Sequence, residues 1–242
     1  MKQLIVSTRG TYDLHNGKRL KTKKPFITPV SKYNNLSKAK EIVIFVHGMR
    51  NSTIGAKMGT NALRLRLRKL GYKGEIIGFS YDSNVRGAHL DKNYHKVLRV
   101  ADKIAEASGE DLANVINDIR KNNYSAKIRL VGHSLGCDVV KSAFNYLGFN
   151  HIHSTHLFGS PIEEDDLVDF SNFINTCKVV NYYNPTDDVI KEGVTKGALE
   201  RPSCLHKVNH INYPTHIISK RLYAKNHGMR AHMNALRSFP WQ

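Results

Sequence analysis

Residues 127–140 constrain the fold of this chain more than any other stretch, because they predict a strand, a sharp turn and the start of a helix in direct succession. Residues 128–131 are largely apolar with β-branched side chains, which indicates a buried strand. Gly132, Ser134 and Gly136 then form a Gly-x-Ser-x-Gly pattern. Glycine on both sides permits a tight turn and a helix that passes close to the strand, so the hydroxyl of Ser134 is expected at the tip of the turn.

Strand-like and helix-like segments alternate along the chain from residue 41 onward. Residues 41–46 are a continuous apolar run, typical of a central parallel strand that is covered on both faces. Apolar residues at helical spacing predict helices over 55–70 and about 94–122, with Gly109 as a possible kink in the second. Further strands are predicted at 2–8, 73–80, 154–161, 179–183 and 205–213. This order predicts an α/β fold with a mostly parallel, doubly wound sheet flanked by helices, in one domain over residues 1–242.

Two segments fall outside this alternation. Residues 1–40 predict a first, edge strand and then a loop or hairpin excursion, because Gly, Pro, Asn and Lys are frequent over 9–35. Residues 84–96 are polar, and we expect them to form a loop or lid above the carboxyl edge of the sheet.

The chain is strongly basic, with a formal charge of +17 over 242 residues. A field of that sign favours phosphates, anionic lipid head groups or acidic substrates. The basic runs at 18–24 and 64–69 lack the interleaved aromatic residues of a platform that stacks nucleic-acid bases. Peripheral association with an anionic membrane surface is therefore favoured over nucleic-acid binding.

The cysteines, Cys137, Cys177 and Cys204, are widely spaced and match no metal-ligand pattern. Their odd number and spacing favour a reducing, cytoplasmic setting. The first apolar stretch is too short for a signal peptide and is soon interrupted by Arg9, and no run of about 20 apolar residues spans a bilayer. We expect neither a metal nor a cofactor.

Four blocks of the sequence resemble the serine α/β-hydrolase superfamily, specifically its lipase and esterase-like branch. The blocks are Val46-His47-Gly48-Met49, Gly78-Phe79-Ser80-Tyr81-Asp82-Ser83, Gly132-His133-Ser134-Leu135-Gly136 and Tyr183-Asn184-Pro185-Thr186-Asp187-Asp188-Val189. The likeness extends over about residues 41–235 and does not cover the first forty. It implies an α/β-hydrolase fold in which a serine, an acid and a histidine follow in that order along the chain.

The chemistry of such a site requires an imidazole to take the serine proton and a carboxylate to hold the imidazole. Adjacent side chains on an extended segment point in opposite directions, so only one of Asp187 and Asp188 faces the site. Among the 13 histidines, His210, His216 and His227 lie near or after the last predicted strand. The resemblance implies Asp187, with Asp188 as the alternative, and His227, with His216 and His210 as alternatives.

The resemblance also implies an oxyanion hole made by the backbone N–H groups of Met49 and Leu135, each next to a motif residue. The function that follows is hydrolysis of a carboxylic ester, on a small-molecule or lipid substrate, through an acyl-enzyme formed on Ser134. The alternative is a non-catalytic protein of the same fold that binds nucleic acid or anionic membrane through its basic surface.

Overall fold

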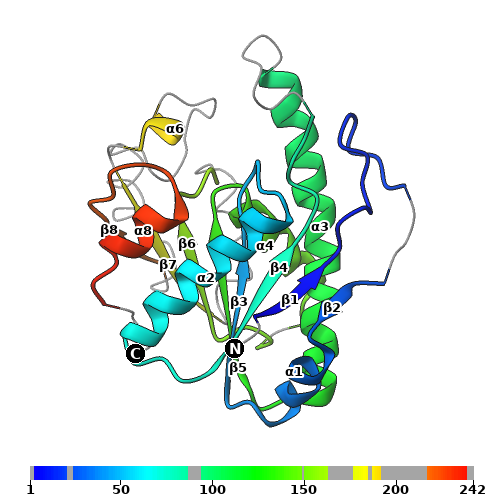
Figure 1. Cartoon of the computed structure of the whole chain (residues 1–242), viewed down its shortest axis with the longest axis vertical. Helices are drawn as coiled ribbons and strands as arrows, with labels where there is room; N and C mark the ends of the chain where they lie inside the picture. The colour runs from blue at the N-terminus through cyan, green and yellow to red at the C-terminus, as the bar shows by residue number, and fades with distance from the viewer. Residues whose placement is uncertain are drawn as a thin grey trace.

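The computed structural model describes residues 3–20, 24–86, 94–148, 150–162, 177–184, 187–191 and 217–238. Within these residues the chain forms an eight-stranded sheet in the order β2-β1-β4-β3-β5-β6-β7-β8 (Figure 1). The strands are β1 (Leu4–Ser7), β2 (Phe26–Thr28), β3 (Glu41–Val46), β4 (Glu75–Ser80), β5 (Lys127–His133), β6 (Ser154–Phe158), β7 (Lys178–Tyr183) and β8 (Ile217–Arg221).

Every described pairing in the sheet is parallel except that of β1 with β2. The predicted mostly parallel sheet is therefore confirmed. The first strand is not at the edge as predicted, because β2 returns from the 9–35 excursion and pairs antiparallel on its outer side. Parallel strands align their carboxyl ends, so the segments after β3, β4, β5, β6 and β7 meet at one edge of the sheet.

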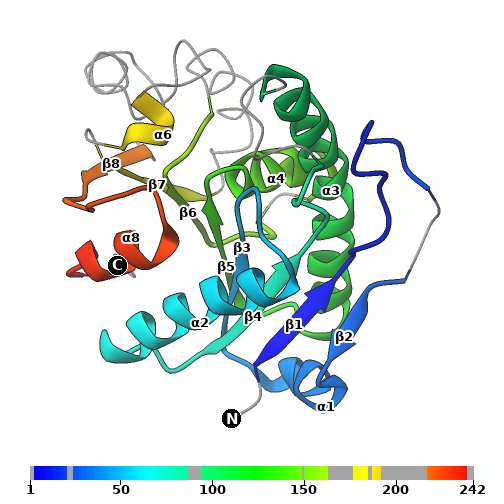
Figure 2. The same ribbon diagram turned by 45° about the horizontal axis from the view of Figure 1, so that its top comes forward.

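Helices cover both faces of the sheet (Figure 2). The described helices are α1 (Val30–Asn34), α2 (Thr53–Lys69), α3 (Tyr94–Asn122), α4 (Gly136–Ala143), α6 (Asp188–Lys191) and α8 (Met229–Ala235), with 3₁₀ turns η1 (Asn35–Lys38) and η3 (Phe144–Tyr146). Helices α3 and α4 pack together over one apolar cluster, and α2 and α8 lie beside each other over a second. The sheet is thus buried on both sides, which explains the continuous apolar run of β3.

Residues 94–122 form one continuous helix, α3, and not two segments divided at Gly109. A side chain at Gly109 would lie 2.7 Å from the backbone carbonyl carbon of Ser142, so this glycine allows α4 to approach α3 closely.

Several other expectations from the sequence fall in part or wholly outside the described residues. The expected loop or lid at 84–96 is described only up to residue 86 and from Tyr94, where α3 already begins. The strand expected at 205–213, with His210, lies outside the described residues, and the last described strand is β8. His216 is also outside them, and it precedes β8 in the sequence instead of following the last strand. No helix among the described residues is both long and apolar enough to cross a bilayer.

Candidate functional site

The turn between β5 and α4 holds Ser134 in a strained backbone conformation at the carboxyl edge of the sheet. Its φ of 51° lies in the left-handed region, which non-glycine residues rarely adopt. A side chain at Gly132 would lie 2.9 Å from Cα of Cys137, and one at Gly136 would lie 2.7 Å from the carbonyl oxygen of His47. The two glycines therefore permit the close approach of α4 to β5 and of the turn to the segment after β3.

Asp187 and His227 form a close pair at the same edge. Nδ1 of His227 lies 2.7 Å from Oδ2 of Asp187, whose side chain is 0% exposed. The other carboxylate oxygen accepts the backbone N–H groups of Val189, at 3.1 Å, and Ile190, at 3.3 Å. The proton of the imidazole is therefore held on Nδ1, facing the carboxylate.

The environment of Asp187 favours its ionised form. Burial raises the pKa of this carboxyl and is the largest single influence. The hydrogen bond from His227, the charge interaction with that ring and the N–H of Ile190 together outweigh burial and hold the pKa of Asp187 below its usual value. The site thus contains a buried carboxylate that is charged near neutral pH.

His227 lies on the segment between β8 and α8, against the residues that flank Ser134. The carbonyl of Phe158 accepts the N–H of Ser134 at 2.9 Å, and a side chain at the next residue, Gly159, would lie 3.0 Å from Cε1 of His227. Nε2 of His133 donates to the carbonyl of His227 at 2.8 Å. Nε2 of His227 is buried and, within the described part of the chain, makes no hydrogen bond, including to Ser134. This nitrogen is therefore left available to accept a proton.

The segment after β3 lies directly against Ser134. A side chain at Gly48 would lie 2.8 Å from Cβ of Ser134. The carbonyl of Gly48 accepts hydrogen bonds from Nδ1 of His47 at 2.9 Å and from Nδ2 of Asn51 at 3.0 Å. Because the peptide bond is trans, the N–H of Met49 points away from these two donors. Among the described residues, neither the N–H of Met49 nor that of Leu135 has a hydrogen-bond partner.

Arg9, immediately beyond β1, ties this segment to the N-terminal part of the chain. Its Nε donates to Oγ of Ser80 at 2.8 Å, and its Nη2 donates to the carbonyl of Asn51 at 2.8 Å and to Nε2 of His47 at 3.2 Å. The guanidinium thus fixes the tautomer of His47, with the remaining proton on Nδ1 and directed at Gly48. Arg9 was not predicted as a site residue; the one signal in the sequence was its position directly after the strand predicted at 2–8.

The segment that carries Asp82 holds Arg9 in place. The carboxylate of Asp82 accepts the backbone N–H groups of Gly10, Thr11 and Tyr12, at 2.9 to 3.0 Å. The 9–35 excursion, for which no chemical role was predicted, therefore begins with a segment that hydrogen bonds to Asp82 hold beside the candidate site.

Four buried histidines among the described residues, His47, His133, His156 and His232, make the folded chain sensitive to acid, because burial lowers the pKa of each. Burial lowers the pKa of His47 to about 3, with the Gly48 carbonyl opposing the shift and the charge of Arg9 adding to it. Burial also lowers the pKa of His156 to about 3, with Arg129 adding to the shift. Unfolded histidine has a pKa of about 6.5, so between these values only the unfolded chain takes up the protons, and stability falls as the pH is lowered.

We therefore expect His47 and His156 alone to lower the free energy of unfolding by about 2–3 kcal/mol between pH 6 and pH 5, at about 1.2 kcal/mol each. His133 and His232, whose pKa values are also lowered by burial, add to this fall. Urea unfolding at pH 7, 6 and 5 measures this change. The variant His156→Gln should show a shallower dependence, since it removes one of these sites. A free energy of unfolding that stays constant from pH 7 to pH 5 would contradict the assignment.

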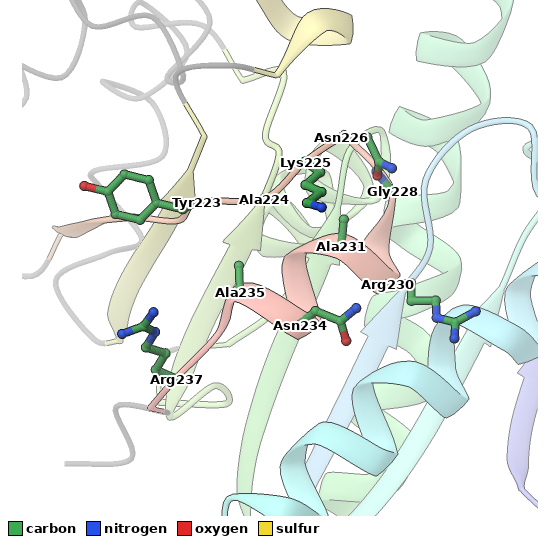
Figure 3. Close-up of a pocket in the computed structure, with 10 residues that line it drawn as sticks. All are labelled: Tyr223, Ala224, Lys225, Asn226, Gly228, Arg230, Ala231, Asn234, Ala235 and Arg237. Atoms are coloured by element: carbon green, nitrogen blue, oxygen red, sulfur yellow. The ribbon is translucent and has the colours of Figure 1, made fainter.

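The structure contains a surface pocket of about 550 Å³ beside His227 (Figure 3). Its lining among the described residues comes from the stretch 223–237, which includes the cations Lys225, Arg230 and Arg237 and no carboxylate. In Figure 3 the side chains of Tyr223 and Arg237 lie at one end of the pocket and that of Arg230 at the other. The surface next to His227 is therefore basic. Among the described residues, no cluster of histidine, cysteine, aspartate or glutamate side chains could hold a metal ion.

The structure thus brings Ser134, Asp187 and His227 to one edge of the sheet, with Met49 and Leu135 beside the serine. Asp187 bonds to His227 through its carboxylate, while Asp188 begins α6.

A family model described as "Alpha/beta hydrolase of unknown function (DUF900)" matches residues 23–176. The chain belongs to this family. The resemblance seen in the sequence is therefore confirmed at the level of the α/β-hydrolase superfamily, as is the α/β-hydrolase fold. The match includes Ser134 and the segment after β3 and ends before Asp187 and His227. A search of curated proteins gives no match.

Two solved structures of low sequence identity share the fold of this α/β hydrolase, and a third is less similar. TT1662 from Thermus thermophilus has a TM-score of 0.51 and 12% identity, over 80% of this chain and 84% of that one. An uncharacterized protein from Bacillus cereus ATCC 10987 has a TM-score of 0.50 and 9% identity, over 87% of this chain and 58% of that one. A lipase-esterase related protein from Clostridium acetobutylicum ATCC 824 has a TM-score of 0.49 and 12% identity, over 82% and 91% of the two chains.

Proposed function

We propose that this α/β hydrolase cleaves carboxylic esters through an acyl-enzyme on Ser134. The observation that carries the proposal is the His227 ring, which is held on Asp187 through Nδ1. Its Nε2 is buried and has no hydrogen-bond partner among the described residues, at the same edge of the sheet where Ser134 lies on a strained turn. A serine hydroxyl is a weak nucleophile until an oriented imidazole takes its proton. In this proposal Ser134 is the nucleophile, His227 the general base and Asp187 the group that orients the base.

The proposed reaction has two steps of the same form. Oγ of Ser134 attacks the ester carbonyl carbon while its proton passes to Nε2 of His227, giving a tetrahedral alkoxide. When the alkoxide collapses, the bond to the alcohol oxygen breaks and the imidazolium returns the proton to the leaving alcohol. Water then attacks the acyl-enzyme in the same way and releases the carboxylic acid and the free serine.

The alkoxide would be stabilised by the backbone N–H groups of Met49 and Leu135. Both are without partners in the described part of the chain, and the Gly48 carbonyl is anchored so that the N–H of Met49 faces away from His47 and Asn51. Each preorganised donor of this kind contributes about 3 to 4 kcal/mol to the rate when it is present.

Turnover of p-nitrophenyl esters of short and medium acyl chains, measured beside the matching p-nitroanilides and thioesters, tests the proposal. We expect hydrolysis of the oxygen esters that saturates with substrate concentration. A protein that hydrolyses the anilides but not the esters, or that shows no activity on any of the three, would refute it.

Arg9 is proposed to act on the same reaction as a positioning residue. Without its contacts to His47 and Asn51, the segment that carries the N–H of Met49 loses two anchors. We expect Arg9→Met to lower kcat by about 10- to 100-fold with little change in KM, because a misplaced donor acts mainly on the transition state.

Arg19 provides the matched control for Arg9. It belongs to the same N-terminal excursion but pairs with Glu110, at 3.3 Å, and Asp111, at 3.1 Å. Arg19→Met should keep kcat near the wild-type value, and Arg9→Lys should recover part of the activity lost in Arg9→Met. Equal losses of kcat in Arg9→Met and Arg19→Met would show a general effect of the excursion on folding and not a positioning role.

A further inference from the structure

The solvent-facing side of α2 carries an apolar stripe. Its inward side is defined by the buried residues Ala56, Thr60, Leu63 and Leu67. At about 100° per residue, positions 54, 58 and 65 fall on the opposite side of the helix. These positions hold Ile54, Met58 and Leu65, which are 70%, 66% and 55% exposed. Apolar side chains that gather on one exposed face, unlike apolar residues scattered singly, are a feature of interaction sites.

Cations flank this stripe, and no acid interrupts it. Lys57, Arg68 and Lys69 are exposed on either side of it, and α2 contains no aspartate or glutamate. The combination of an outward apolar line with basic flanks is the pattern of helices that lie in the interface of a lipid bilayer.

The segment 223–237 extends the same basic surface. Helix α8 lies beside α2 (Figure 2). The Arg66 guanidinium donates to the carbonyl of Leu236. Together residues 53–69, with five cations, and residues 223–237, with three, carry eight cations and no carboxylate. We call these two segments the α2–α8 face.

The chemistry of the α2–α8 face selects among possible occupants. A second copy of the chain would place two cationic faces in contact, which is repulsive. Nucleic acid would match the charge but would leave the apolar stripe without a partner, and the face offers Tyr223 as its single large aromatic side chain for base stacking. An anionic bilayer matches both features, because its head groups are negative and its acyl boundary accepts apolar side chains.

We propose that the α2–α8 face docks on anionic lipid bilayers, with Ile54, Met58 and Leu65 inserted at the boundary of the head groups. Lipid phosphates then meet the flanking cations and those of the pocket beside His227. Helix α2 begins directly after its N-cap residue, Ser52. The residues before Ser52 belong to the segment after β3 that lies against Ser134. If the proposed function holds, docking brings the candidate site close to the lipid, but docking itself does not depend on catalysis.

Vesicle flotation with the full-length Ser134→Ala protein tests the proposal separately from catalysis. We expect binding to phosphatidylcholine vesicles that contain about 30% phosphatidylglycerol, little binding to pure phosphatidylcholine, and a loss of at least about tenfold when NaCl is raised from about 0.1 to 0.5 M. Absence of binding to the anionic vesicles would overturn the proposal whatever the esterase assays show.

Matched variants localise the binding surface. The triple change Ile54→Ser/Met58→Ser/Leu65→Ser should weaken binding by about tenfold or more, while Leu20→Ser/Val30→Ser/Tyr124→Ser, at other exposed apolar positions, should not. Lys57→Gln/Arg68→Gln/Lys69→Gln should likewise weaken binding more than Lys103→Gln/Lys121→Gln/Lys127→Gln, which removes the same charge elsewhere.

Three results would contradict the assignment of this face. One is an equal loss of binding in test and control variants. Another is a self-associated protein that the stripe variant converts to monomer, with no vesicle binding. The third is tight, salt-sensitive RNA binding that the stripe variant leaves intact while vesicles fail to bind.

Discussion

Replacing Ser134 with alanine is expected to lower kcat for p-nitrophenyl ester hydrolysis by about 10⁵-fold or more. The reason is that no other group replaces the attacking oxygen, and residues that act as one catalytic unit lose most of their effect when one is removed. Steady-state rates of wild-type and variant proteins, purified in parallel, measure the loss. The variant should remain folded, because the change removes only a hydroxyl. Gly132 and Gly136, which permit the tight turn, stay in place.

Ser142 in α4 is the matched control for this change. It is buried in the helix that follows Ser134, and its hydroxyl donates to the carbonyl of Glu106 at 2.6 Å, away from the turn. Ser142→Ala should cost about 1 kcal/mol of stability through the lost hydrogen bond and leave kcat near the wild-type value. Retention of ester turnover in Ser134→Ala would contradict an acyl-enzyme formed on Ser134.

Replacing Asp187 with asparagine is expected to lower kcat by about 10⁴-fold. The carboxylate accepts the proton on Nδ1 of His227, and an amide in its place favours the tautomer in which Nε2 carries the proton and cannot act as a base. Steady-state kinetics measure the loss, and urea unfolding shows separately how much of it reflects stability.

The neighbouring aspartate and the alternative histidines supply controls. Asp188→Asn makes the same chemical change one residue along, and we expect it to alter kcat by no more than a few-fold. His227→Ala should lower kcat about as much as Ser134→Ala does, whereas His210→Ala and His216→Ala should retain most of the activity. A larger loss in either of these two than in His227→Ala would transfer the role of base to that residue.

Local patterns in the sequence were sufficient to predict the frame of the site. The apolar runs at β3 and β5 need burial on both faces, and this requirement alone indicates a parallel sheet between helices. The glycines around Ser134 predict a tight turn because a side chain at either would collide with the neighbouring backbone. These features depend on residues close together in sequence or on simple periodicity.

Features that depend on distant pairs were not predictable in the same way. Strand β2 forms the edge of the sheet because the chain folds back after residues 9–25 and pairs with β1. No periodic pattern in the sequence indicates this pairing. Arg9 contacts His47 from 38 positions away, and its role follows from three-dimensional placement beside β4. The chain has 13 histidines, and the approach of His227 to Asp187 depends on how the segment after β8 folds back.

The proposed proton acceptor, His227, and the carboxylate of Asp187 lie beyond the part of the chain that the family model matches. The matched part supplies the strained serine and the segment with the N–H of Met49, and the remainder supplies Asp187 and His227. Variants in both parts therefore test the same proposed site. Similar losses of kcat in the two groups of variants would support one site built from both parts.

The most direct test of the central claim is the site at which a fluorophosphonate probe becomes attached to the protein. Such a probe phosphonylates a serine that an adjacent base has activated, so peptide mass mapping after labelling identifies the nucleophile. We predict one adduct, on the peptide that contains Ser134, that is absent in Ser134→Ala and strongly reduced in His227→Ala. An adduct on a different residue, or none in the folded wild-type protein, would contradict the account.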